Sequence, residues 1–118
     1  MTGREWIVDA HGCDAAALRD LETLKKLFAR IVEALELCPV GETIWHQFPE
    51  PGGITGMCLL QESHLTCHTF PEHASLCLNL FCCKPRHEFN FMIHLGYEFQ
   101  AESVRVRRME RPYGQAPA

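Results

Sequence analysis

The densest group of reactive side chains in the chain lies at residues 62–72, which read ESHLTCHTFPE. This segment contains hydroxyl, imidazole, thiol and carboxylate groups, which can supply a nucleophile, a proton carrier and a ligand contact. Two adjacent cysteines, Cys82 and Cys83, follow at the end of an apolar run. A polar loop at the end of a strand is the ordinary explanation of such a cluster, so the order of its residues must decide whether it is a catalytic site.

That order resembles the bacterial and archaeal S-adenosylmethionine decarboxylases, at about the size of the short class of that family. The resemblance covers most of the chain and rests mainly on the string of residues 62–72. It also includes Phe81-Cys82-Cys83, the start of the first helix at Gly12-Cys13-Asp14, and Gly53-Ile54-Thr55-Gly56.

The resemblance implies a proenzyme that cleaves itself between Glu62 and Ser63. The hydroxyl of Ser63 would attack the carbonyl of Glu62, and elimination followed by hydrolysis would leave a covalent pyruvoyl group in place of the serine. The products would be a β chain of residues 1–62 and an α chain of residues 63–118. Thr55, where the family usually has Ser, and His68, as proton carrier, are implied to assist this processing.

The resemblance also implies how the substrate reacts. The pyruvoyl group at Ser63 would form a Schiff base with the substrate amine and accept electrons as CO₂ leaves. Cys83 is implied to be the proton donor to the substrate α-carbon, and strand parity separates it from Cys82, which belongs with the leucines of its strand. Glu72 is implied to bind the ribose hydroxyls, and Phe48 and Phe70 are candidate aromatic contacts. The product would be decarboxylated S-adenosylmethionine for spermidine and polyamine synthesis.

Two alternatives remain open at this point. The same fold and pyruvoyl chemistry could act on L-ornithine or L-arginine, because Phe70 replaces the commoner Trp, Lys84 stands where Gly often follows the cysteine, and the loop 49–53 is longer than usual. A non-cleaving binding or metal-binding module is the other alternative, since the chain has seven Cys and seven His. The chain contains no Cys-x-x-Cys and no His-Glu-x-x-His, however, so we predict no metal site.

Composition excludes several other classes of protein. The 118 residues are 47% hydrophobic and 22% charged, which fits one globular domain. A net charge of −4 argues against a nucleic-acid partner. No apolar stretch approaches the roughly 18 residues of a membrane span. The polar N-terminus and the odd cysteine count predict a cytoplasmic protein with free thiols.

The hydrophobic pattern predicts strands at 4–12, 42–48, 54–61, 76–83 and 103–109. Helices are expected at 14–37 and from Pro85 through Tyr97. This β-α-β-β-β-α-β order predicts an α+β fold, a two-layer α/β sandwich with an antiparallel sheet and two helices on one face. We expect a single domain at 1–111 and a flexible tail at 112–118.

Strand geometry adds two expectations. Ser63 and His68 have opposite parity, so they can share a site within one strand only if the backbone bends or bulges between them, and we therefore expect an irregular strand near residues 63–68. The outer positions of the strand 76–83 are neither fully polar nor fully apolar, which suits a second subunit better than water. We therefore expect a homodimer of αβ units with its sites near the interface.

Overall fold

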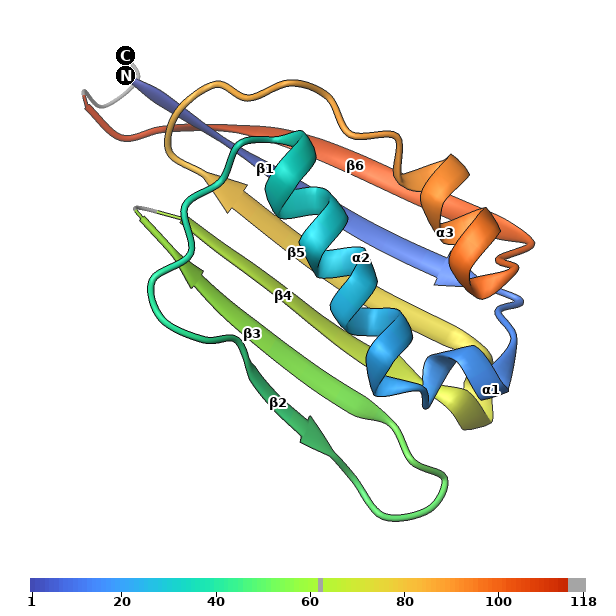
Figure 1. The fold of residues 1–118 in the computed structure, drawn as a ribbon. Coiled ribbons are helices and arrows are strands. Elements are labelled where there is room, and N and C mark those ends of the chain that lie inside the picture. Colours follow the sequence, from blue (N-terminus) through green and yellow to red (C-terminus); the bar gives the residue numbers. More distant parts are fainter. Residues whose placement is uncertain (62, 115–118) are drawn as a thin grey trace.

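A computed structural model describes residues 1–61 and 63–114, and there the chain forms one antiparallel sheet with its helices on one face (Figure 1). The strand order in the sheet is β2-β3-β4-β5-β1-β6. The strands are β1 (Thr2–His11), β2 (Ile44–Gln47), β3 (Ile54–Leu60), β4 (Ser63–Phe70), β5 (Ser75–Cys82) and β6 (Ser103–Pro112). The helices are α1 (Ala15–Leu18), α2 (Leu21–Ala34) and α3 (Phe91–Phe99), with a short 3₁₀ turn η1 (Pro71–His73). The predicted α+β two-layer class is confirmed.

Strand β4 is an element that the hydrophobic pattern did not predict. It pairs with β3 from Leu60↔Ser63 to Thr55↔His68, and with β5 over its whole length. Its alternate residues Leu65, Cys67 and Thr69 are buried against the helices. The predicted bend between Ser63 and His68 is therefore wrong, because this alternation keeps the strand regular and paired on both sides.

The helices begin at different residues from those predicted. The expected helix 14–37 is interrupted, and α2 restarts after Asp20, whose carboxylate accepts hydrogen bonds from the Glu22 backbone N–H and the Thr23 hydroxyl. The last helix begins at Phe91 rather than at Pro85, because the Asn90 side chain accepts a hydrogen bond from the Ile93 backbone N–H. In both cases a capping side chain satisfies a backbone donor that has no partner within the helix.

The hydrophobic core lies between the sheet and the helices. The leucines at the even positions of β5 and Cys82 are all buried there, as predicted. Cys13, Cys58 and Cys67 are also buried. Burial raises the pKa of the Cys67 thiol to about 12, so this group stays neutral and packs as a small apolar side chain.

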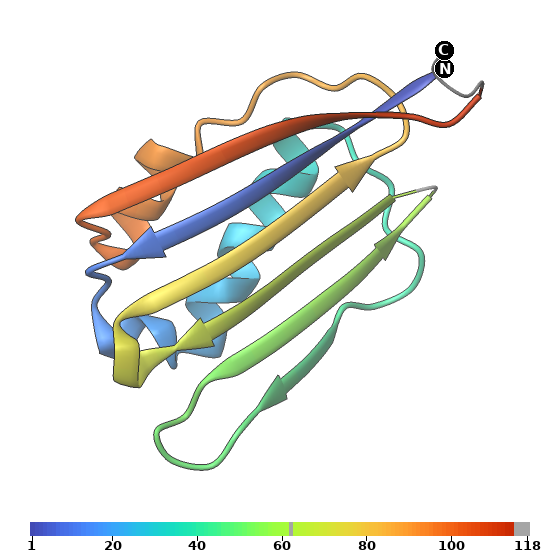
Figure 2. The same cartoon turned by 180° about the vertical axis from the view of Figure 1, so that it is seen from behind.

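In the described part of the chain, all helices lie on one face of the sheet, and the other face carries none of them (Figure 2). Towards β2 and β3 it exposes Ile44, Met57 and Leu59. Towards β1 and β6 it is charged, with ion pairs between Arg107 and Asp9 and between Arg111 and Glu5. A hydrogen bond from Asn79 to Glu5, together with the charge of Arg111, lowers the pKa of the Glu5 carboxyl. We call this surface the open face.

Strand β6 reaches into the segment that was expected to be a tail. Pro112 is its last residue, and the Tyr113 hydroxyl donates a hydrogen bond to the carbonyl oxygen of Cys83 at 2.9 Å. The rest of the expected tail, residues 115–118, lies outside the described residues. Within residues 1–61 and 63–114, no helix has the length and apolar character needed to cross a membrane.

Candidate functional site

The predicted site residues fall into two groups near opposite ends of β4. Ser63 is the first residue of this strand, and His68 lies five positions further along. Because a strand rises about 3.3 Å per residue, the two positions are about 16 Å apart. Ser63 is paired with the buried Cys82, whereas His68 is exposed on the open face. A single chain therefore does not bring Ser63 and His68 together.

The first group lies around a small cavity where β3 and β5 end and β4 begins, which we call the Ser63 cavity. Ser63 and Cys83 are both half-buried and both line it. Its volume is about 50 Å³. Its full lining is Leu37, Cys38, Leu60, Gln61, Ser63, Cys83, Lys84 and Arg86. The predicted cleavage residue Glu62 lies outside the described residues.

The second group lines a larger cavity of about 380 Å³ near the opposite end of β4, which we call the His68 cavity. Thr55 Oγ1 and His68 Nδ1 are hydrogen-bonded at 3.0 Å across the β3–β4 ladder. Phe48 is 51% exposed and Phe70 is 40% exposed, so both rings are available to a ligand. The cavity is lined by Phe48, Pro49, Pro51, Gly53, Thr55, His68, Thr69, Phe70 and Glu72. The His68 cavity therefore contains several residues that the sequence analysis named as candidates: Thr55, His68, Phe48, Phe70 and Glu72.

A buried threonine fixes the backbone of the His68 cavity. The Thr69 hydroxyl donates to the carbonyl oxygen of Leu18 at 2.7 Å and accepts from the backbone N–H of Ile54 at 2.8 Å. Gly53 packs directly against this strand, since a Cβ atom there would lie 2.6 Å from the Thr69 carbonyl oxygen. Thr69 therefore connects α1, the start of β3 and the end of β4, next to His68 and Phe70.

We predict that Thr69→Val destabilises the protein by about 1–3 kcal/mol, because it leaves a buried donor and a buried acceptor without partners. Urea unfolding at equilibrium measures this change in free energy. Thr66→Val, on the open face of the same strand, is the matched control and should change stability by less than about 0.5 kcal/mol. Equal effects of the two substitutions would show that the Thr69 hydrogen bonds do not stabilise the fold.

Sequence reasoning missed one residue of the Ser63 cavity. Arg86 lies in the irregular segment between β5 and α3, where no periodicity or motif marks a position as functional. Lys84 had been noticed only as a departure from the family pattern. No three His, Cys, Asp or Glu side chains in the described part of the chain are placed to hold a metal ion together.

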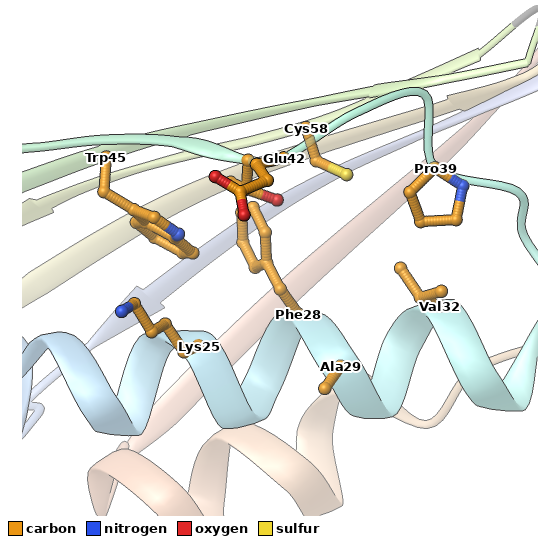
Figure 3. A pocket seen from close by; sticks show the side chains of 9 residues that line it. Lys25, Phe28, Ala29, Val32, Pro39, Glu42, Trp45 and Cys58 are labelled. Atoms are coloured by element: carbon orange, nitrogen blue, oxygen red, sulfur yellow. The ribbon is translucent and has the colours of Figure 1, made fainter.

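A larger cavity than either of these lies elsewhere, on the helix side of the sheet. Its volume is about 430 Å³. Figure 3 shows Lys25 and Phe28 extending from α2 toward Trp45 and Cys58. None of the predicted site residues lines it. Size alone is thus a poor guide to the site here, and the two smaller cavities carry the reactive groups.

Comparison with known proteins agrees with these observations. Residues 4–112 match the family model described as S-adenosylmethionine decarboxylase. The chain is 33% identical over 117 residues to S-adenosylmethionine decarboxylase proenzyme 2 of Halalkalibacterium halodurans, covering 98% of this chain and 88% of that protein. It is 32% identical over 118 residues to the S-adenosylmethionine decarboxylase proenzyme of Anoxybacillus flavithermus, covering 98% and 90%.

A solved structure has the same fold. The adenosylmethionine decarboxylase from Aquifex aeolicus superposes with a TM-score of 0.77 at 22% identity, covering 98% of this chain and 95% of that one. Family model, relatives and fold all point the same way: the chain belongs to the S-adenosylmethionine decarboxylase family.

Proposed function

We propose that this protein is a self-processing, pyruvoyl-dependent decarboxylase that converts S-adenosylmethionine to its decarboxylated form for polyamine synthesis. The observation that carries the proposal is the placement of Ser63. It is the first residue of β4, and it lines one cavity with Cys83 in a chain of this family.

The hairpin around Ser63 fits the formation of a pyruvoyl group. Leu60 and Ser63 are paired across the hairpin, so only two positions separate the strands. Attack of the Ser63 hydroxyl on the carbonyl of residue 62 would exchange the amide for an ester. The β3–β4 ladder, which continues to Thr55↔His68, would hold both chains together after cleavage.

Each of the two cavities would have its own role in decarboxylation. When present, the pyruvoyl carbonyl supplies an electron sink for the electrons left behind by CO₂. Cys83, half-buried beside Ser63, would deliver a proton to the substrate α-carbon. This role requires that the sulfur of Cys83 stay reduced, which fits the reducing conditions of the cytoplasm.

The His68 cavity has the chemistry to hold a nucleoside. Phe48 and Phe70 offer exposed aromatic faces for stacking on a base, and the exposed carboxylate of Glu72 can accept hydrogen bonds from ribose hydroxyls. The Thr55–His68 pair lies in the same cavity and would serve the processing of Ser63 by holding and moving a proton.

These roles require a homodimer, because one chain holds the two cavities about 16 Å apart by strand length. A two-fold axis through the sheet would set the Ser63 end of one chain against the His68 end of its partner, twice in each dimer. The open face offers an apolar surface for this contact in Ile44, Met57 and Leu59.

A CO₂-release assay tests the substrate. Purified protein is incubated separately with carboxyl-labelled S-adenosylmethionine, L-ornithine and L-arginine. We expect release from S-adenosylmethionine with at least about a hundredfold preference in kcat/KM, since neither amino acid has a base to stack on the aromatic rings or ribose hydroxyls to donate to Glu72. Preferred release from ornithine or arginine would contradict the proposed substrate while leaving the cleavage chemistry in place.

A further inference from the structure

The Ser63 cavity also contains two cationic side chains that have no part in the roles proposed above. Lys84 and Arg86 both line it, together with the Ser63 hydroxyl and the Cys83 thiol, neither of which is an acidic group. Arg86 is half-buried, and its Nε atom is buried without a hydrogen-bond partner among the described residues. Burying a guanidinium N–H without a hydrogen-bond acceptor costs free energy, so an anion that binds at this position would stabilise it.

The charge of Arg86 reaches the strand position opposite Ser63. Burial raises the pKa of the Cys82 thiol, and the positive charge of Arg86 acts against that increase. Cys82 is the direct cross-strand partner of Ser63. Arg86 therefore lies close enough for its positive charge to act on the strand position that is paired with Ser63.

Self-cleavage produces such a charge beside Ser63. In the ester form, residue 62 is linked through its carbonyl carbon to the Ser63 oxygen. A base removes the proton from the Ser63 α-carbon, the Cβ–O bond breaks, and its electron pair leaves on the carboxylate of residue 62. A carbon–carbon double bond remains on residue 63, and the carboxylate becomes the new C-terminus of the β chain.

We propose that the Arg86 guanidinium, assisted by Lys84, stabilises this departing carboxylate and then holds it as the C-terminus of the β chain. The inference rests on the proposed self-processing. A planar guanidinium suits the task because it can donate two parallel hydrogen bonds to a carboxylate.

The substrate carboxylate is a less suitable ligand for these cations. A cation paired with that group stabilises the ground state from which CO₂ must leave, and this pairing is lost in the transition state. The carboxylate of residue 62, in contrast, gains charge during its step and keeps it. The same electrostatics that would slow decarboxylation would thus speed self-cleavage.

The test follows cleavage of freshly produced chains on denaturing gels. Arg86→Gln should process about 100- to 1000-fold more slowly than the unaltered chain, the loss typical for one donor to a developing oxyanion. Arg86→Lys, which keeps the charge but loses the planar donor pair, should fall between them. Lys26→Gln, on the exposed side of α2, removes a charge far from the cavity and should process normally.

Hydroxylamine separates a role in this step from a merely structural one. It cleaves esters, so Arg86→Gln should yield more hydroxylamine-released α chain with an unmodified serine at its N-terminus than the unaltered chain does. Cleavage at the unaltered rate, slow cleavage without an ester, or a change confined to KM would overturn the inference. If the unaltered chain itself stays uncut, the proposed function fails instead.

Discussion

The Ser63→Ala variant is expected to remain a single 118-residue chain with no decarboxylase activity. The substitution removes the only oxygen that can form the ester at this peptide bond, so neither cleavage nor the pyruvoyl group can follow. We expect CO₂ release from S-adenosylmethionine to fall by at least about 10⁴-fold, as for loss of a catalytic nucleophile. Denaturing gels and the CO₂-release assay measure the two effects on the same sample.

Ser75→Ala provides the matched control for this experiment. Ser75 opens the neighbouring strand β5, and its hydroxyl donates a hydrogen bond to the carbonyl oxygen of His73. This variant loses a strand serine without touching the Ser63 cavity, so it should cleave and react normally. Cleavage of Ser63→Ala at the same position, or loss of cleavage in both variants, would show that Ser63 is not the processing residue.

Two inactive variants should restore cleavage when they are produced together. Ser63→Ala lacks the nucleophile and His68→Ala lacks the proton carrier, so each alone should stay uncut. In a mixed dimer, the intact Ser63 of the His68→Ala chain faces the intact His68 of the Ser63→Ala chain. With random pairing at equal amounts, about half of the His68→Ala chains lie in such dimers and should be cut.

A tag on the His68→Ala chain identifies which polypeptide is cleaved in this mixture. Cleavage confined to the tagged chain, at the bond before residue 63, supports sites shared between protomers. A mixture in which both chains remain intact would mean that Ser63 and His68 act within one chain. That result would require a rearrangement of β4, because its pairing with β3 and β5 separates the two residues.

The fold class could be predicted because most of its elements have a clear period. The leucines of α2 recur at helical spacing, and the leucines of β5 alternate. Strand β4 was missed because its polar residues His64, Thr66 and His68 made the segment look like a reactive loop. Its buried alternate residues show that pairing on both sides, which no local pattern reveals, determines its structure.

The candidate site residues could be named from the sequence, but their arrangement in space could not. The resemblance to the family identified Ser63, Cys83, His68 and Glu72 as candidates. Strand parity indicated that the side chains of Ser63 and His68 point to opposite faces of the sheet. Whether the backbone bends enough to bring them together depends on the pairing of β4 with β3 and β5, and no local sequence pattern predicts that pairing. Arg86 could not be predicted for a related reason, because the irregular segment between β5 and α3 places it at the Ser63 cavity.

The mass of the unaltered protein under denaturing conditions tests the central claim most directly. The proposed chemistry predicts two chains, residues 1–62 and 63–118. The α chain should carry a pyruvoyl group in place of its N-terminal serine: elimination removes one water from the serine, and hydrolysis of the enamine adds one water and releases one ammonia. Its mass should therefore equal that of a serine-started chain less NH₃. A single uncut chain of 118 residues in active material would contradict the account.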